Sequence, residues 1–224
     1  MATEHVYRNG AGITANEATA AINYQRSTII SDEVRQWIKE GRVFQGGSGV
    51  LTTPVADGVE DLTRQEPQFM VRVPAGVVIV PLMVLWTPEA TLAIAQMLIS
   101  TCSNDPGVAN RTAVTPVNVN TRFATNNSAV TAYGTNTDAS GTAPTQVCDL
   151  YREYHQADRD AITGAPTPPL IYNPREGHGQ ECVIGNGINV QSFLVHVQGG
   201  ATNATKTGFI ITTWAEFTYD EYYG

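Results

Sequence analysis

The stretch FMVRVPAGVVIVPLMVLW, residues 69–86, decides the fold class of this chain. It predicts two apolar β-strands joined by a tight corner at the Pro-Ala-Gly of residues 74–76. Six of its residues are valine, whose branched side chain suits a pleated, half-buried surface. Pro81 cannot donate a hydrogen bond to a neighbouring strand, so we expect the second strand to lie at a sheet edge or to be bulged or bent there. The stretch therefore predicts a β-sandwich.

Further strands are expected on both sides of this stretch. The two clearest segments, residues 188–197 and 207–219, alternate apolar and polar side chains, and the Gly-rich turn between them predicts an antiparallel hairpin. Residues 91–102 are compatible with a helix, but the preceding Pro88 and the alternation of apolar residues favour a strand. About eight strands separated by turn signals predict an all-β antiparallel sandwich of jelly-roll type. The remaining candidate strands are residues 50–53, 114–123 and 129–133, and residues 147–154 form a further apolar and aromatic segment.

A short helix is predicted before the first strand, in SDEVRQWIKEG, residues 31–41. Ser31 can cap the free amides at its start, and Gly41 can take the left-handed conformation that ends a helix. Its apolar side chains share one face, so the helix packs on something. That face consists of Val34, Trp37 and Ile38.

We divide the chain into an N-terminal arm with this helix, residues 1–45, and a jelly-roll sandwich domain, residues 46–224. The arm either covers one end of the sandwich or docks on a neighbouring subunit. Residues 103–146 carry only four charged side chains and are rich in Thr, Asn, Ala and Gly. A long polar excursion of this kind within a sandwich is typical of an interaction surface.

The charge of the chain limits its partners. Charged residues make up 15% of the sequence, against roughly 25% in an ordinary soluble domain, and 27 Thr accompany only two Lys. A neutral polar surface favours contact with other protein; the alternative is the composition bias of a secreted or heat-adapted protein. The formal charge of −8 and the lack of a basic arm argue against direct nucleic-acid binding.

No membrane or export segment is predicted. The longest apolar runs are too short to span a bilayer, so we expect no transmembrane segment. The first residues, MATEHVYRNG, hold no hydrophobic signal core. We therefore expect synthesis in the cytoplasm.

Histidines and cysteines give no metal or catalytic signature. The four His do not occur at ligand spacing, and the nearest cluster is GHGQEC with His178, Glu181 and Cys182. His196 lies in the expected final hairpin and is predicted to be a surface or interface residue. The chain also lacks the Gly-x-Ser-x-Gly, P-loop and dinucleotide patterns. We therefore predict no catalytic, cofactor-binding or metal residues, and no enzyme activity.

The three cysteines, Cys102, Cys148 and Cys182, are odd in number and far apart in the sequence. No disulfide framework follows from them. We expect them to be small buried hydrophobic residues.

Four aromatic residues are candidates for an interface between subunits. Tyr219, Tyr222 and Tyr223 lie in the terminal sequence YDEYYG, and Trp37 lies on the apolar face of the predicted helix. Tyrosine and tryptophan are enriched at protein interfaces. The alternative is that these side chains pack on their own domain.

Two segments bear on the family, VRVPAGVVIVPLMV at residues 71–84 and FIITTWAEFTYDEY at residues 209–222. They resemble segments of single jelly-roll virion proteins of tailless bacterial and archaeal viruses. The resemblance implies a capsid subunit without cofactors that contacts copies of itself and other virion proteins, and that is located in the virion after synthesis in the host cytoplasm. Many RNA-virus jelly rolls carry an Arg- and Lys-rich arm that this chain lacks, so direct genome binding is not expected.

Two other classes of function remain open. A carbohydrate-binding sandwich of a phage fibre or secreted protein requires an exposed tryptophan in a groove. A cupin-like metal enzyme requires histidine ligands. The tryptophans concerned are Trp37, Trp86 and Trp214, and the histidines are His155, His178 and His196.

Overall fold

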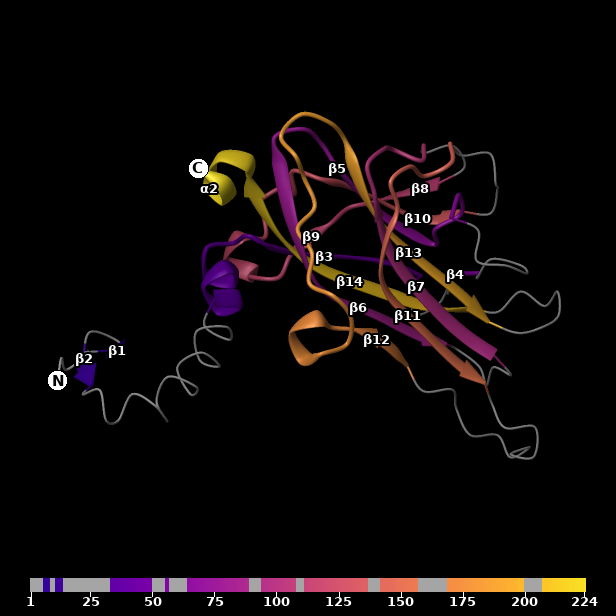
Figure 1. Ribbon diagram of the computed structural model, residues 1–224, viewed down its shortest axis with the longest axis horizontal. Coiled ribbons are helices and arrows are strands. Elements are labelled where there is room, and N and C mark those ends of the chain that lie inside the picture. Colours follow the sequence, from indigo (N-terminus) through magenta and orange to yellow (C-terminus); the bar gives the residue numbers. More distant parts are fainter. Residues whose placement is uncertain are drawn as a thin grey trace.

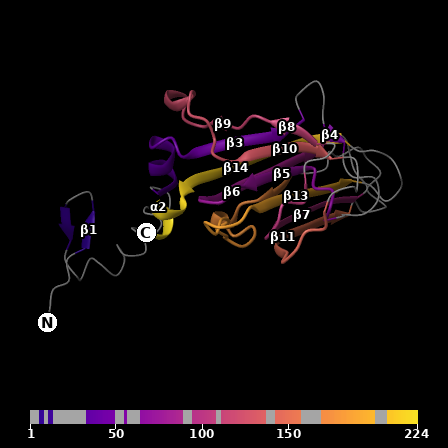
Figure 2. The ribbon, with the colours of Figure 1, turned by 90° about the horizontal axis from the view of Figure 1, so that it is seen from above.

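The two apolar runs of residues 69–86 lie in opposite layers of a β-sandwich (Figures 1 and 2). They form β5 (Phe69–Val73) and β6 (Val77–Pro88), as predicted. At the corner between them, Gly76 has a φ of +81° and the Val77 N–H donates to the Pro74 carbonyl at 3.3 Å. The computed structural model describes residues 6–8, 11–13, 33–49, 55–56, 64–88, 94–107, 111–136, 142–156, 169–199 and 207–224.

One layer, the β13 sheet, contains six antiparallel strands among these residues. In spatial order they are β11 (Cys148–Gln156), β7 (Ile94–Cys102), β13 (Gln191–Gly199), β5, β10 (Thr131–Asn136) and β8 (Arg111–Val114).

The other layer, the β14 sheet, is also antiparallel. In spatial order its described strands are β12 (Leu170–Tyr172), β6, β14 (Thr207–Thr218), β3 (Val43–Ser48) and β9 (Val117–Asn118), and β4 (Val55–Ala56) also pairs with β14.

Short elements accompany the two sheets. They are a helix over residues 33–39, the 3₁₀ turns η1 (Thr121–Phe123) and η2 (Pro174–Glu176), the terminal helix α2 (Tyr219–Tyr223), and the pair of strands β1 (Val6–Arg8) and β2 (Ala11–Ile13). The predicted all-β antiparallel sandwich with a short N-terminal helix is thus confirmed. No helix in the described ranges has the length and apolar character needed to cross a membrane.

Pro81 is accommodated by a bulge rather than by an edge position. β6 lies between β12 and β14, so the edge prediction was wrong. The bulge prediction was right, because β14 pairs Thr213 with Met83 and Trp214 with Pro81, leaving Leu82 without a partner residue. The bulge interrupts the regular pairing of β6 with β14 at this point, so no hydrogen bond is required from the residue that lacks an N–H.

The predicted final hairpin was wrong. β13 pairs with β5 and β7, whereas β14 pairs with β6, β3 and β4 in the opposite sheet. Each strand alternates because it buries one face against the other sheet, and alternation specifies that face without specifying the neighbouring strand. The turn between them, residues 200–206, lies outside the described residues.

Residues 114–123 do not form one strand as predicted. The chain leaves the β13 sheet after β8, passes Pro116, and joins the β14 sheet at β9 before the η1 turn. Ile188 was also misplaced, because it lies before β13 and is 80% exposed. The other predicted strands are present in β7, β10, β13 and β14, and the candidate at residues 50–53 lies outside the described residues. β11 was not predicted as a strand.

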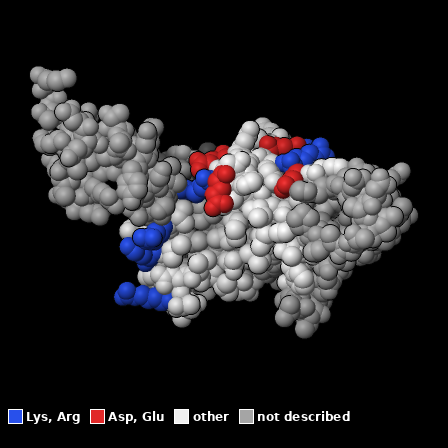
Figure 3. All heavy atoms as spheres, turned by 90° about the horizontal axis from the view of Figure 1, so that it is seen from below, with Lys and Arg blue, Asp and Glu red and all other residues white. Residues whose placement is uncertain are grey.

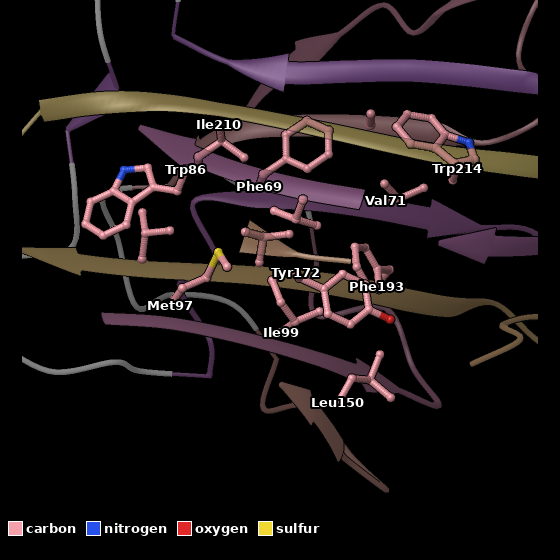
Figure 4. Packing of buried hydrophobic residues seen from close by; sticks show 14 of the residues in the cluster. Phe69, Val71, Trp86, Met97, Ile99, Leu150, Tyr172, Phe193, Ile210 and Trp214 are labelled. Atoms are coloured by element: carbon pink, nitrogen blue, oxygen red, sulfur yellow. The ribbon is translucent and has the colours of Figure 1, made fainter. Parts of the chain in front are cut away.

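Large apolar side chains from both sheets fill the space between the layers (Figure 4). Trp86 and Trp214 lie towards opposite ends of this cluster, with the rings of Phe69, Tyr172 and Phe193 between them. Burying one such side chain contributes about 1.5–3 kcal/mol to stability. The interior of the sandwich is therefore a packed core.

The outer face of the β14 sheet is covered by the helix of residues 33–39. Its predicted apolar face packs on a second buried cluster, and Gly41 ends the helix with a φ of +72°, as expected. Ser31, the predicted cap, lies outside the described residues. The boundary predicted between residues 45 and 46 falls inside β3. The residues of the second cluster are Val43, Val80, Leu82 and Ala215.

Candidate contact surface at the α2 end of the sandwich

The four predicted interface residues belong to one group of aromatic side chains, the aromatic cluster. Phe217 connects them: its ring centroid lies 5.2 Å from that of Trp37 and 5.4 Å from that of Tyr222. Tyr223 continues the cluster at 4.9 Å from both Tyr222 and Tyr219. These distances are those of attractive aromatic pairs.

Three elements distant in sequence bring these rings together. Trp37 comes from the helix of residues 33–39, Phe217 from the last residues of β14, and the tyrosines from α2, which follows β14 directly. Figure 1 shows that this helix and α2 lie at the same end of the sandwich.

A capping box fixes the start of α2. The Glu221 N–H donates to Thr218 Oγ1 at 3.3 Å, and the Thr218 N–H donates to Glu221 Oε2 at 2.9 Å. The Tyr219 N–H donates to the Gly76 carbonyl at 2.9 Å and ties α2 to the β5–β6 corner.

Two arginines lie over the aromatic cluster. Arg42 donates from Nη1 and Nη2 to the two carboxylate oxygens of Glu221 at 3.0 Å each, and from Nε to Glu40 at 2.8 Å. Its guanidinium carbon is 5.2 Å from the Phe217 ring centroid. Arg175 stacks in the same way on Trp37 at 5.1 Å. The planar guanidinium group suits both the paired carboxylate and the aromatic face.

Part of the cluster is open to solvent. Tyr223 is 54% exposed and Tyr219 is 37% exposed, whereas Trp37 and Tyr222 are half-buried. A Cβ atom on Gly187, next to the exposed Ile188, would lie 3.1 Å from the Tyr219 ring. The exposed side chains of Tyr219, Tyr223 and Ile188 therefore form an apolar surface at this end, which we call the tyrosine end.

A hollow of about 520 Å³ adjoins the aromatic cluster, and its lining includes Arg42, Phe217 and Glu216. Glu216 is 7% exposed and accepts hydrogen bonds from the Ser128 hydroxyl at 2.5 Å, the Ala129 N–H at 2.7 Å and Trp214 Nε1 at 2.8 Å. Burial raises the pKa of Glu216. Because these donors bind its carboxylate, we assign Glu216 to holding the loop before β10 against β14.

Acidification is expected to release α2 through Glu221. The hydrogen bonds from Arg42, and then those from Thr218, lower the pKa of Glu221 from 4.5 to about 2. A carboxylate with a lowered pKa in the folded state contributes stability above its unfolded value, and that contribution is lost as the pH falls from 4.5 towards 2. The NMR signals of the Tyr222 and Tyr223 rings should shift in this window.

The matched control is Glu221→Gln, which cannot ionise. Its tyrosine signals should lack this transition, while acid effects arising elsewhere in the chain persist. If the tyrosine signals titrate equally in the wild type and in Glu221→Gln, the transition does not arise from Glu221.

His196 was predicted to lie at a surface and is instead buried. It is 1% exposed on the outer face of the β13 sheet, beside the backbone of Arg64 and Leu98. Burial lowers its pKa to about 4. The segment before β5 lies beside it: Gln68 accepts from the Val197 N–H at 2.9 Å. Alternation along β13 could not reveal that this outer face is covered.

The other predicted histidines do not form a metal site in the described residues. His178 is exposed, and the side chain of His155 on β11 lies outside the described set. No three His, Cys, Asp or Glu side chains within the described ranges are grouped as ligands of one ion. A cupin-like centre therefore has no donor set in this part of the chain.

The tryptophans do not form an exposed groove. Trp86 and Trp214 are 0% and 1% exposed, so neither is the exposed tryptophan that the carbohydrate-binding alternative requires. Trp37 packs between Phe217 and Arg175.

The cysteines follow the prediction only in part. Cys102 is buried and Cys182 half-buried, but Cys148 is exposed. The prediction for Cys148 was therefore wrong.

No sequence pattern marks Phe217, Arg42 or Arg175 as part of this surface. The alternation along β14 included Phe217, but Arg42 and Glu221 are 179 residues apart and no local pattern connects them. No protein-family model matches the chain, and a search of curated proteins finds no match to it.

Proposed function

We propose that the protein is a structural virion protein, a jelly-roll subunit that assembles with copies of itself and with other virion proteins. The observation that carries this proposal is the strand order: β3, β14, β6 and β12 are neighbours in one sheet, and β5, β13, β7 and β11 in the other. Among these eight strands, which leave out the short β4, successive strands change sheet at each step except from β7 to β11, where β8, β9 and β10 are inserted. In a jelly roll, two nested Greek keys lead to an order of this kind, so the order supports the proposal.

Jelly rolls occur in viral capsids, lectins and cupins, so the fold alone does not select among these functions. Apolar side chains occupy the space between the sheets, which leaves little room for a cupin-like centre. The burial of Trp86 and Trp214 removes two of the three side chains on which the sugar-binding alternative depended. The shell subunit is therefore the better supported function.

Surface composition also supports contact between subunits. Figure 3 shows a face on which most of the described surface carries neither basic nor acidic side chains. The tyrosine end adds exposed aromatic groups, which are enriched at interfaces, and we propose that it takes part in the contact between copies. The formal charge of −8 favours a shell that does not itself neutralise the genome.

Light scattering after size-exclusion chromatography, with electron microscopy of the same fractions, tests this function. We expect assemblies that grow with protein concentration and that have a closed or regular outline. A monodisperse monomer at high concentration over a wide range of salt would contradict the proposal.

Placing a charge at the tyrosine end should weaken assembly. In Tyr223→Asp, a carboxylate replaces a half-exposed ring, and the concentration needed for half-assembly should rise at least about tenfold. The matched control is Tyr154→Asp on β11, where the native ring is 49% exposed. Circular dichroism verifies that both variants fold. Unchanged assembly of the first variant, or an equal loss in both, would remove the tyrosine end from the interface.

A further inference from the structure

Residues 178–184, which we call the closing segment, contact both sheets of the sandwich. The Gln180 N–H donates to the Leu150 carbonyl of β11 at 3.0 Å. Ile184 bridges to Ile79 of β6 through hydrogen bonds of 2.8 and 3.0 Å. The closing segment therefore contacts the edge strand β11 of one sheet and β6 of the other.

The closing segment runs antiparallel to the start of β11. Besides the bond between Gln180 and Leu150, a Cβ atom on Gly179 would lie 3.2 Å from Tyr151 Cβ. Both contacts have the same register, because one residue forward in one segment corresponds to one residue back in the other. Continued by two residues from Gln180, past the bulge of β11 between Asp149 and Tyr151, this register brings Cys182 close to Cys148.

The two cysteines also face the same side. Cys148 pairs with Thr101 on β7, whose inward-facing residues alternate with outward-facing ones, and Thr101 lies two residues from the core residue Ile99. Cys182 packs against the same core. Burial raises the pKa of the Cys182 thiol to about 12, and the charge of Cys148 adds to this rise, as expected for thiols that lie near each other.

Facing residues of antiparallel strands have Cβ atoms about 4.5–5.5 Å apart, and a disulfide needs about 3.5–4.5 Å. The remaining adjustment is on the order of 1 Å, and it falls in a segment that is not part of a regular strand. We propose that Cys148 and Cys182 form a reversible disulfide that fastens the closing segment to β11.

Thiol–disulfide exchange with a small disulfide such as oxidised glutathione supplies the chemistry. The exposed Cys148 thiolate attacks one glutathione sulfur, a mixed disulfide forms, and one glutathione thiolate leaves. The Cys182 thiolate then attacks the Cys148 sulfur and the second glutathione leaves. The two protein thiols lose two protons and two electrons, and oxidised glutathione gains them as two reduced molecules. The second step is the slower one, since few Cys182 thiols are ionised.

Peptide mapping of the oxidised protein tests this pairing without any substitution. Trypsin cleaves after Lys and Arg, so the three cysteines fall in separate peptides, residues 73–111, 123–152 and 176–206. After incubation with oxidised glutathione, we expect the loss of two of the three thiols, a mass lower by two hydrogen atoms, and a link between residues 123–152 and 176–206.

Two variants sharpen the test. Cys102→Ser should oxidise as the wild type does, because it keeps the proposed pair. Cys182→Ser should stop at a stable glutathione adduct on Cys148. A lasting glutathione adduct on the wild type, a Cys148 link between two chains, or a link to residues 73–111 would overturn the pairing.

The biological consequence rests on the proposed function. A subunit made in reducing cytoplasm would keep both thiols free, and a shell released into oxidising surroundings would gain the link. The two proposals fail separately, because thiol mapping does not depend on the oligomeric state and light scattering does not depend on the thiols.

Discussion

Replacing Trp214 with alanine is expected to lower the free energy of unfolding by about 3–5 kcal/mol, the cost of truncating a large buried aromatic side chain. Trp214 is 1% exposed in the main core, and its indole ring fits against Gly46, where an added Cβ atom would lie 3.1 Å from the ring. The substitution also removes the donor at 2.8 Å from the buried Glu216 carboxylate. Urea denaturation followed by circular dichroism measures this loss.

A pair of phenylalanine variants separates packing from hydrogen bonding at this site. Trp214→Phe and Trp86→Phe make the same truncation in the same core, but Trp86 Nε1 has no hydrogen-bond partner among the described residues. Trp214→Phe should therefore cost more, by about 1.5–3 kcal/mol, the value of a hydrogen bond to a charged group. Equal losses would show that the bond to Glu216 contributes nothing to stability.

Gly185→Ala is expected to destabilise the protein by about 3 kcal/mol, because it combines backbone strain with a steric clash. Gly185 has a φ of +132°, and an added Cβ atom would collide with the Val77 carbonyl and lie 2.9 Å from Val78 Cα. The residue follows Ile184, so the clash should also open the bridge to Ile79. Urea denaturation gives the loss of stability. Hydrogen exchange at the amides of Ile184 and Ile79 reports whether the bridge between them has opened.

Gly76→Ala is the matched control. Its φ of +81° is also positive, but no heavy atom lies within 4 Å of the added Cβ. Only the backbone strain of about 1–2 kcal/mol is expected there. If both substitutions lower the free energy of unfolding equally, the steric clash at Gly185 does not explain why glycine is needed there.

Local sequence patterns predicted where the strands and helices lie better than they predicted which strands pair with each other. The valines of β5 and β6 and the helix ending at Gly41 follow from preferences of single residues and their immediate surroundings. The partners of β13 and β14 do not, because alternation is satisfied by burying a face against any suitable layer. The pattern could therefore not distinguish a hairpin from a crossing between sheets.

The candidate surface was predictable only as a set of separate residues. Trp37 and the tyrosines of α2 were selected for their chemistry, but their meeting around Phe217 depends on how β14 and the first helix pack. The burial of His196 likewise depends on contacts with a segment far away in the sequence, since Gln68 and Val197 are 129 residues apart.

The position of β14 also bears on how the protein is made. β3 pairs with β9 and β6 pairs with β12, but these two pairs are joined into one sheet only when residues 207–218 are inserted between β3 and β6. Until β14 has been synthesised, the β14 sheet lacks its central strand. Trp37 then cannot pack against Phe217. Nascent chains therefore cannot present a finished aromatic cluster, and under the proposed function incomplete copies should not assemble through this end.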